Sequence, residues 1–534
     1  MTDNKSSAGL RRRQRSMQTV RYITLATALS VGASWAQSVT VTGDASASPN
    51  PNPIPHWDYT HFLELVIGNS GEGELAIENG GTMTSGLYPW HRVILGKLAG
   101  SSGTATVSGL GSLWKHLGDI HVGDGGRGEL NVVDGGGVSA SEIEVGIGGL
   151  SILNGGTVSA VGVSAKNENS AIRVSGAGSH LQSSLSVSAG SAQIGEGGQV
   201  SGESGSIGGN GAITVSGPGS RWTVGWYLGV GSGGTGSLLI ENGGAVVTTD
   251  DSGYIMLGHN SDTGYGNVQV TGQGSVWDLA GKLFIGNTGN ASVTVDDGGR
   301  IIARGEARLA DGSTSTSNLT VENGGRFSSD RLVVGNHGEG SLNLRNGGEL
   351  SVRLLDLGWR GLGSSIMNIG SASNNPSDAV AAGRLNTEFV SLRDNAVLNF
   401  NHTGDELKID GSVIGIGRLN HISGTTRVRT MSGAFQPLIV SGGNLIIEQV
   451  NYLSGKLAIL SGASLAVDAR HGESSIDATL TGGGNLTKSG DEKLEFLGDG
   501  SGFTGDTRVT AGELQVFSEL GGKADVSGRP AQLV

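Results

Sequence analysis

The chain has 534 residues, of which 97 are Gly, more than twice the usual share of about 7%. It contains 9 Pro, no Cys and 36% hydrophobic residues, which excludes collagen, a disulfide-stapled domain and an ordinary disordered chain. Helices are disfavoured because each interior Gly costs about 0.5–1 kcal/mol relative to Ala. The composition therefore indicates a long all-β chain in which Gly marks many tight turns.

The first 36 residues have the pattern of a secretory signal peptide. A basic segment precedes an apolar stretch, and its basic residues are Lys5, Arg11, Arg12, Arg13, Arg15 and Arg21. Ser34 and Ala36 place small residues at the ends of a cleavage site, which predicts cleavage before Gln37 and export through the inner membrane. Because the basic segment is long, Met17 is an alternative start to Met1. A membrane anchor is disfavoured because the apolar stretch is too short to span a bilayer comfortably.

The exported chain is strongly acidic. Without residues 1–36 it keeps 29 basic and 47 acidic side chains, a net charge of −18. Such a charge repels nucleic acid, so no nucleic-acid partner is expected. No second apolar run has the length of a transmembrane helix.

Residues 37–61 contain four of the nine Pro residues and are predicted to be a linker or an irregular N-terminal cap. They end in His56-Trp57-Asp58-Tyr59-Thr60-His61, the densest group of functional side chains. In this group His56, Trp57 and His61 are candidates for binding a metal or a sugar. The favoured interpretation is an aromatic cap over the open end of a repeat array.

Residues 62–370 are built from three recurring motifs. In the first, an apolar residue follows two positions after Asn-Gly-Gly or Asp-Gly-Gly; these residues are Met83, Val138, Val158, Val246, Ile301, Phe327 and Leu350. The second motif contains Gly-x-Gly-Ser and ends at Trp114, Leu181, Trp222 and Trp277. The third is an apolar residue followed by Gly, at Gly68, Gly123, Gly231, Gly286 and Gly335.

The spacing of the motifs also repeats. From Gly80, steps of 31 and 24 residues lead through the second motif to the next copy of the first, and the same two steps recur from Gly243. Short alternating strands joined by Asn-Gly corners cannot bury their inner face within one repeat, whereas stacked repeats bury a continuous apolar column. The pattern predicts an all-β solenoid, a parallel β-helix of roughly 20 coils. A β-propeller is the alternative, but its blades repeat every ~40–50 residues.

Trp114, Trp222 and Trp277 occupy one motif position, and two roles fit them. They are candidates for a carbohydrate-binding stripe along the surface. Because each follows a Gly-Ser corner, packing in or against the apolar column is the favoured role.

The C-terminal part has a different pattern. Residues 371–384 are predicted to be a break or insertion, residues 385–520 a second β-helix section, and residues 521–534 a polar tail. Neither Gly-x-Ser-x-Gly nor His-Glu-x-x-His occurs, so no catalytic residue, metal or cofactor is predicted. Asp251-Ser252-Gly253 matches part of a serine-protease motif but lacks the preceding Gly, and a polar turn is favoured.

The repeats resemble the passenger region of bacterial autotransporters (type V secretion) of the adhesin-like kind. Residues 484–516, with Lys488, Phe503-Thr504-Gly505 and Gly512-Glu513-Leu514, are similar to the autotransporter-associated β-strand repeat. The resemblance implies a right-handed β-helix that is exported to the cell surface, the outer membrane or the medium, with a role in virulence. It also implies a C-terminal translocator barrel, which would need well over a hundred residues after residue 534.

A non-enzymatic surface or secreted adhesin is therefore expected, with host-cell or bacterial surface molecules as partners. The lack of a barrel adds two expectations: export by a separate outer-membrane translocator, with a periplasmic location if there is none, or a truncated remnant of an autotransporter. A polysaccharide-acting enzyme is the main alternative, because β-helices also carry lyases and hydrolases. Such an enzyme requires charged residues grouped on one face, with perturbed pKa values.

Overall fold

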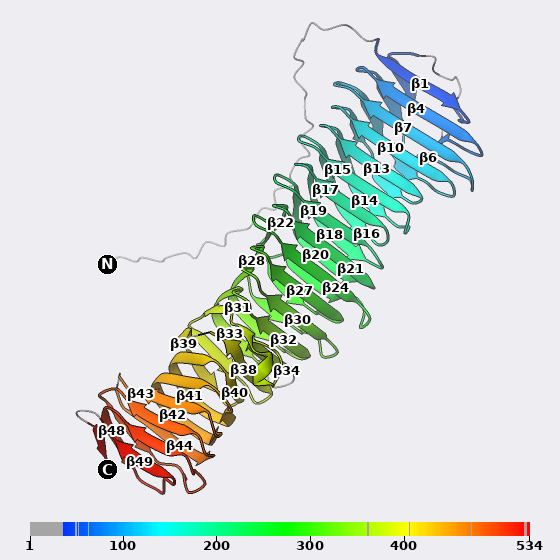
Figure 1. Ribbon diagram of the computed structural model, residues 1–534. Coiled ribbons are helices and arrows are strands. Elements are labelled where there is room, and N and C mark those ends of the chain that lie inside the picture. The colour runs from blue at the N-terminus through cyan, green and yellow to red at the C-terminus, as the bar shows by residue number, and fades with distance from the viewer. Residues whose placement is uncertain are drawn as a thin grey trace, which may run out of the picture. The chain divides into compact units, whose positions relative to one another are not determined.

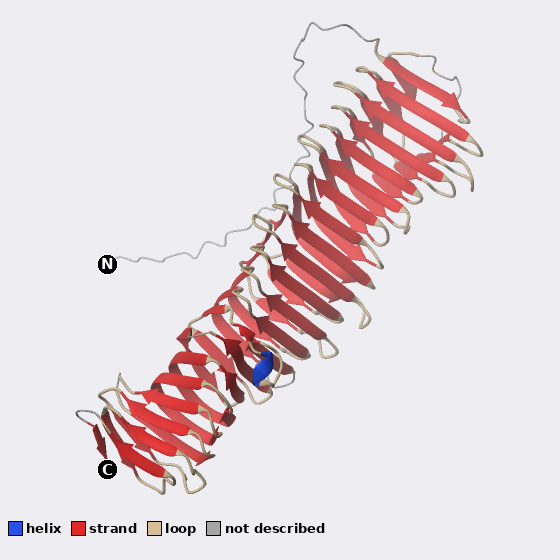
Figure 2. Cartoon of the chain, viewed as in Figure 1, coloured by secondary structure: helices blue, strands red, loops and turns tan. Residues whose placement is uncertain are grey.

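The computed structural model describes residues 36–47, 51, 53–61, 63–359, 363–404, 406–470, 472–527 and 531–534. All but the last residue of the predicted signal peptide therefore lies outside the described residues. Residues 37–534 form one compact unit. Strands dominate the described ranges, and a short 3-10 helix, η2 (Pro376–Asp378), lies among them (Figure 2). In these ranges no helix has the length and apolar character needed to cross a membrane.

The strands wind into a β-solenoid of about 20 coils, as predicted (Figure 1). Each coil has three sides, which we name faces A, B and C. Face A holds the strand before each Asn-Gly-Gly corner, face B the strand after it, and face C the strand that ends at the third motif. Among the named strands of the described ranges, all pairings are parallel except that of β1 (Ser38–Gly43) with β4.

Face A contains β4 (Glu72–Glu78), β7 (Ser102–Ser108), β10 (Arg127–Val133), β13 (Gly148–Leu153), β15 (Ser170–Ser175), β17 (Ser191–Gly195), β19 (Ala212–Ser216), β21 (Thr235–Glu241), β24 (Tyr265–Thr271), β27 (Asn290–Asp296), β30 (Thr316–Val321), β32 (Glu339–Leu344), β34 (Ser364–Gly370), β38 (Ala396–Thr403) and β40 (Arg418–Ser423). Face B contains β2 (His56–Tyr59), β5 (Thr82–Ser85), β8 (Leu113–His116), β11 (Gly137–Ser139), β22 (Ala245–Thr248), β25 (Val276–Leu279), β28 (Arg300–Ala303), β36 (Arg384–Asn386), β43 (Ser464–Asp468), β45 (Asn485–Ser489), β47 (Asp506–Val509) and β49 (Lys523–Val526).

Face C contains β3 (Glu64–Ile67), β6 (Arg92–Leu95), β9 (Asp119–Val122), β12 (Glu142–Val145), β23 (Tyr254–His259), β26 (Lys282–Ile285), β29 (Ala307–Leu309), β37 (Phe389–Leu392), β46 (Lys493–Phe496), β48 (Gly512–Val516) and β50 (Ala531–Leu533). Some strands bend from face B into face C: β14 (Thr157–Ala165), β16 (His180–Val187), β18 (Gln199–Gly208), β20 (Arg221–Ser232), β31 (Arg326–Val334), β33 (Glu349–Leu357) and β39 (Leu407–Gly415). The long strands β41 (Thr425–Val440) and β42 (Asn444–Ile459) run through faces B, C and A, and β44 (Ser474–Thr481) runs from face C into face A.

A column of apolar side chains runs through the solenoid behind face B. The register places one residue per coil in it: Trp57, Met83, Trp114, Val138, Val158, Leu181, Val200, Trp222, Val246, Trp277, Ile301, Phe327, Leu350 and Leu385. None is more than 4% exposed. The last apolar residue of the first motif and that of the second motif therefore lie in the same column behind face B.

The Asn-Gly-Gly and Asp-Gly-Gly corners have positive φ angles, which Asn, Asp and Gly adopt more readily than other residues. At all seven, the Asn or Asp has φ between 46° and 54° and the next Gly has φ between 75° and 85°. Two consecutive left-handed residues form a type I′ turn. The second Gly serves close packing, because a Cβ on Gly325 would lie 2.1 Å from the carbonyl oxygen of Val295 in the preceding coil.

The buried Ser of the second motif bonds to the first motif of the preceding coil. The hydroxyl oxygen of Ser275 accepts a hydrogen bond from the backbone N–H of Gly243 at 3.0 Å. The same contact joins Ser112 to Gly80, Ser179 to Gly155 and Ser220 to Gly197. This hydrogen bond gives a physical reason for the constant separation of the two motifs, since the two corners must stack.

The ends and the interior of the solenoid differ from the predicted boundaries. At the N-terminus, β1 covers the edge of β4. The insertion at residues 371–383 carries η2 and β35 (Val380–Ala381), but the stack continues past it, because β34 pairs with β38 and β33 with β36 and β37. Residues 521–534, predicted to be a polar tail, instead contribute β49 and β50, which pair with β47 and β48. Sequence periodicity did not reveal these strands because they are only four and three residues long and lie mostly exposed.

Candidate functional site

The His56–His61 group lies at the first coil of face B. Trp57 points inward and packs against Tyr59, with ring centroids 4.9 Å apart. His56 and His61 are exposed, and His56 Nδ1 lies 2.7 Å from the hydroxyl oxygen of Thr82. In the described part of the chain, no group of three or more His, Asp or Glu is arranged to hold a metal ion. The group thus contributes a buried aromatic layer to the first coil.

Trp114, Trp222 and Trp277 are completely buried in the apolar column. Trp114 Nε1 donates a hydrogen bond to Ser85 Oγ at 2.9 Å, whereas the indole N–H groups of Trp222 and Trp277 have no partner among the described residues. None of the three rings presents a face to solvent, so a carbohydrate-binding stripe cannot be made from them. The physical reason is that their motif position points into the solenoid.

Face C changes its chemistry along the chain. On β14, β16 and β18 its outward residues are small and polar: Ser164, Ser184, Ser186, Ser204 and Ser206. From β20 onward they are aromatic and then charged. We name Trp226, Tyr227, Tyr254 and Phe284 the aromatic row, and Glu306, Arg308, Asp311, Arg331 and Asp356 the charged row.

The aromatic row crosses three successive coils. The register pairs Tyr227 with Tyr254, and the rings of Trp226 and Tyr227 lie 5.5 Å apart. Tyr254 and Phe284 are stacked with centroids 6.3 Å apart. Trp226 is 52% exposed and Tyr254 42%, whereas Phe284 is 8% exposed. Burial raises the pKa of the Tyr227 hydroxyl, which keeps it protonated.

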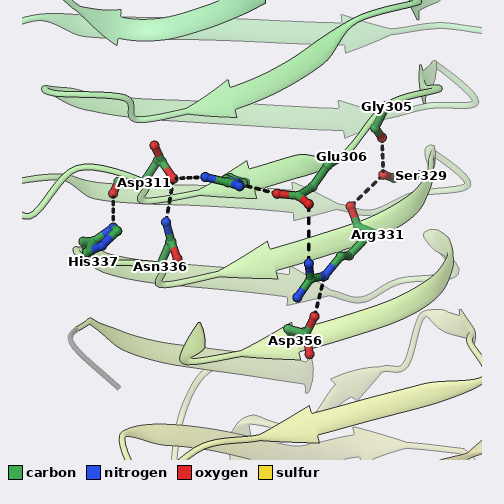
Figure 3. Close-up of polar contacts among 9 residues, drawn as sticks. Gly305, Glu306, Asp311, Ser329, Arg331, Asn336, His337 and Asp356 are labelled. Carbon is green, nitrogen blue, oxygen red and sulfur yellow. Dashed lines mark hydrogen bonds and ion pairs between the residues drawn. The ribbon is translucent and has the colours of Figure 1, made fainter. Parts of the chain in front are cut away.

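The charged row alternates in sign over the next three coils (Figure 3). Arg331 on β31 lies 3.5 Å from a Glu306 oxygen in the preceding coil and 2.7 Å from an Asp356 oxygen in the following coil. Arg308 pairs with Glu306 and lies 3.3 Å from an oxygen of Asp311. Every charge has an opposite neighbour, so the row of three carboxylates and two guanidinium groups joins successive coils through ion pairs.

Neutral polar groups complete this network. Asn336 donates its side-chain N–H to Asp311 at 2.8 Å, and His337 Nδ1 lies 2.9 Å from the Asp311 carbonyl oxygen (Figure 3). Ser329 donates to the Gly305 carbonyl at 3.1 Å and to that of Arg331 at 2.8 Å. The contact of Asn336 holds the Asp311 carboxylate, whereas those of His337 and Ser329 are made to backbone carbonyl groups.

Arginine–aromatic contacts extend the two rows. The guanidinium of Arg308 lies 5.7 Å from the ring of Phe284, which joins the charged row to the aromatic row. At the other end, Arg331 and Arg393 lie 4.1 and 5.6 Å from the ring of Trp359. Cation–π contacts of this kind stabilise by about 0.5–1 kcal/mol at exposed sites. Face C therefore carries a continuous strip from Trp226 to Arg393.

A second candidate region is a groove of about 800 Å³ beside the insertion. Its charged lining residues are Glu349, Arg384, Glu406, Lys408 and Asp410. A hollow of about 320 Å³ continues it and adds Arg427, Arg429, Glu448 and Arg470.

Arg427 is the centre of this charged groove. It pairs with Glu406 and lies 3.6 Å from a Glu448 oxygen and 3.7 Å from an Asp468 oxygen. The hydrogen bond from Arg427 lowers the pKa of Glu406. The groove thus has grouped charges, but they are compensated internally.

Two buried histidines lie next to the groove. The Nε2 atoms of His402 and His421 lie 2.9 and 3.1 Å from the Thr426 hydroxyl oxygen, and His421 Nδ1 lies 2.9 Å from the Gly442 carbonyl oxygen. Burial lowers the pKa of both imidazoles, that of His421 to about 4. Both are therefore neutral in the folded protein at neutral pH.

Sequence reasoning did not select any residue of the aromatic row or the charged row. A usable signal was present, because the third motif sets the phase of face C. Residues two and four positions before its Gly point outward, which identifies Phe284 and Lys282 before Gly286 and Tyr227 before Gly231. The Trp residues that recur in the second motif lie in the core instead, because a position that recurs from coil to coil is one that packs in the apolar column.

No family model and no curated protein matches this chain. Among solved structures, it is similar to the crystal structure of a hyper-glycosylated TibA fragment, whose glycosylation was catalysed by TibC. The match covers 64% of this chain and 99% of the fragment, with 17% sequence identity and a TM-score of 0.25. A TM-score this low transfers neither the fold nor the function of that fragment to this chain.

Proposed function

We propose that this chain is an exported, adhesin-like passenger of the autotransporter type, which acts without catalysis at the cell surface or in the medium. The observation that carries the proposal is the strip on face C. It is a rigid lateral surface, several coils long, whose side chains are aromatic and charged rather than small. A surface of this kind suits contact with another molecule, because binding residues on strands are held more precisely than residues on loops.

The sequence resemblance at residues 484–516 supports the same proposal. The Lys488 side chain of that repeat is buried and donates to the carbonyls of Ser489, Gly490 and Ala511 at 2.8–3.1 Å. The repeat thus has a structural role within the stack. The proposed partners of the chain are the surface molecules of host or bacterial cells. Passage across the outer membrane belongs to this proposal as well.

Attachment and aggregation assays test the proposed function. Cells or beads that carry residues 37–534 should adhere to a host-cell layer or to one another. A variant with the charged row neutralised by Glu306→Gln, Arg308→Gln, Asp311→Asn, Arg331→Gln and Asp356→Asn should adhere less if the strip makes the contact. The matched control is Lys166→Gln with Glu144→Gln, an exposed ion pair on the Ser-rich part of the solenoid. Unchanged attachment after removal of the whole chain contradicts the proposal.

A polysaccharide-acting enzyme is the second candidate, and the grouped charges of the groove favour it. The groove places Glu349, Glu406 and Asp410 near Arg384 and Lys408, and pairs of carboxylates are what glycoside hydrolysis requires. Incubation with polysaccharides should then release reducing ends, and Asp410→Asn or Glu349→Gln should abolish the release. Absence of any product with a broad panel of polysaccharides would leave the adhesin as the better assignment.

A further inference from the structure

The corners of the solenoid expose a reactive pair of residues, Asn followed by Gly. In such a pair the backbone nitrogen of the Gly can attack the side-chain carboxamide carbon of the Asn, because Gly has no Cβ to hinder the approach. The chain contains six of these pairs, which begin at Asn79, Asn154, Asn210, Asn242, Asn323 and Asn346. All six Asn residues are exposed at turns of the solenoid, so access of water does not distinguish them.

The hydrogen bond of the Gly nitrogen does distinguish them. Attack requires this nitrogen to lose its proton and the Asn-Gly peptide to rotate out of the turn, and a hydrogen bond donated by the same N–H opposes both steps. Three of the Gly residues donate to the hydroxyl of a second-motif Ser at 2.9–3.1 Å, namely Gly80 to Ser112, Gly155 to Ser179 and Gly243 to Ser275. Two more donate to carbonyl oxygens, Gly211 to that of Gly208 at 2.8 Å and Gly347 to that of Ala382 at 3.1 Å.

Asn323 and Gly324 differ from the other five pairs. Gly324 is exposed, and its N–H has no acceptor within the described ranges. The cause lies in the following coil, which brings another first-motif corner, at Asn346, where the protected corners meet the Ser of a second motif. The turn itself is the same, since φ is 50° at Asn323 and 51° at the protected Asn242. The free N–H therefore sets this pair apart.

We propose that Asn323 is a modification site, at which the folded chain deamidates itself. The Gly324 nitrogen forms a bond to Cγ of Asn323, the Cγ–Nδ2 bond breaks, and ammonia leaves with the proton of the former N–H. Water then adds to one of the two carbonyl carbons of the succinimide and opens the ring, which leaves an aspartate or an isoaspartate at position 323. The only co-reactant is water, and the reaction is independent of the proposed function.

The product changes the corner in charge and in shape. The register stacks position 323 on Asp297, so the new carboxylate lies beside a like charge in the preceding coil. An isoaspartate also adds one carbon to the main chain, at a corner where a Cβ on Gly325 would already lie 2.1 Å from the Val295 carbonyl oxygen. The modification should therefore loosen the strands on either side, β30 and β31, which hydrogen exchange of the aged protein would show.

Ageing of purified residues 37–534 in mildly alkaline buffer tests the proposal. Samples taken over time would be digested under acidic conditions, and mass spectrometry would follow the change from amide to acid at each Asn-Gly pair. In the folded chain Asn323 should convert about tenfold faster than Asn79, Asn154 and Asn242, because no hydrogen bond holds the Gly324 nitrogen. In denaturant the rates should become similar, since all the pairs then share the same unfolded backbone.

The variant Ser275→Ala makes the comparison within one corner, because it frees the N–H of Gly243. Asn242 should then convert about tenfold faster, whereas Asn79 and Asn154 keep their own Ser acceptors and should be unchanged. The matched control, Ser341→Ala, removes a hydroxyl from the outer side of β32 and should change no rate.

Three outcomes overturn the proposal. The first is a rate at Asn323 in the folded chain that is no higher than the rates at Asn79, Asn154 and Asn242. The second is an unchanged rate at Asn242 in Ser275→Ala, which would show that the hydrogen bond of the Gly nitrogen does not control the reaction. The third is an equal increase at Asn79, Asn154 and Asn242 in that variant, which would assign the effect to general loosening of the solenoid.

Discussion

Asn and Asp at the corners illustrate how single residues determine the coil. Their left-handed backbone costs other residues about 1–2 kcal/mol, whereas their short polar side chains tolerate it. The second Gly of each corner excludes a side chain that would strike the preceding coil. Two requirements of different origin, backbone angle and close approach, therefore produce one short sequence motif.

Replacement of Asn323, which has φ of 50°, by Ala should lower the free energy of unfolding by about 1 kcal/mol. The control is Asn267→Ala, an exposed residue on β24 with extended backbone, which should be neutral within about 0.5 kcal/mol. Denaturant titration measures both. Equal effects of the two changes would show that backbone conformation is not the cause.

Loss of the corner hydroxyl in Ser275→Ala leaves the half-buried N–H of Gly243 without its acceptor. The expected cost is about 1–3 kcal/mol. Ser341→Ala on the outer side of β32 serves as the control, because that side chain is half-buried at the surface. Hydrogen exchange should show faster exchange at Gly243 in the first variant only; unchanged protection there would contradict the role of the hydroxyl.

At the scale of elements, neighbouring strands are joined by buried polar contacts as well as by the apolar column. His402 on β38 and His421 on β40 share the Thr426 hydroxyl on β41. Further along, Lys488 on β45 bonds to the carbonyl of Ala511 in the next coil. Such contacts tie particular coils together and make them sensitive to pH or to single substitutions.

Acid should destabilise the coils around His421. The pKa of His421 is about 4 in the folded chain, against the ordinary imidazole value of 6.5, so the unfolded chain takes up a proton first as the pH falls. The stability from neutral His421 is complete above pH 6.5 and is lost as the pH falls through 4, with a total of about 3 kcal/mol. Thermal unfolding followed against pH checks this, and His421→Gln should flatten the profile. An identical slope in that variant would assign the acid sensitivity to other groups.

Lys488→Met should loosen the C-terminal coils. The change removes a buried ammonium that satisfies three carbonyls, each of which is then left without that partner at a cost of about 1–3 kcal/mol. Faster hydrogen exchange is expected at residues 474–516 and no change at residues 72–145. The control, Lys493→Met, removes a partly exposed ion pair with Glu495 and should have a small effect. Uniform destabilisation of the whole chain would argue against a local role.

At the scale of the whole molecule, strands pair only with strands of adjacent coils, so stability is a sum of local terms. The exposed edge of such a stack is a template for further pairing. In residues 37–534 the strand β1 pairs with the open edge of β4. Because β1 runs antiparallel, the parallel repeat cannot continue beyond it.

Deletion of residues 37–47 should expose β4 and cause self-association. The deleted segment pairs with β4 from Ser38 to Gly43 and contributes the buried Val39 and Val41. Analytical ultracentrifugation should detect larger species, while circular dichroism retains the β signal. A variant that stays monomeric at the same concentration would show that β1 is not needed as an edge cover.

Much of the fold was predictable because its physics is local and repeated. The alternation of apolar residues, the Asn-Gly corners and the constant spacing led to the coils and to the core residues from Met83 to Leu350. The strands β1, β49 and β50 were not predicted, because alternation over three to six residues without the corner motifs does not distinguish a strand from a polar segment. The insertion was predicted at residues 371–384, but not the helix η2 and the strand β35 that it carries. The aromatic row was missed because its positions differ in residue type between coils.

The class of fold, the corners and the inward column could be predicted from the amino-acid sequence, since backbone angle and burial act on every repeat alike. The side chains that the outer faces present became known only from the folded chain. Residues such as Trp226, Tyr254 and Phe284 lie up to 58 positions apart and become neighbours through the register of the coils. The register of two strands depends on the lengths of all the corners between them, and no local motif contains that information.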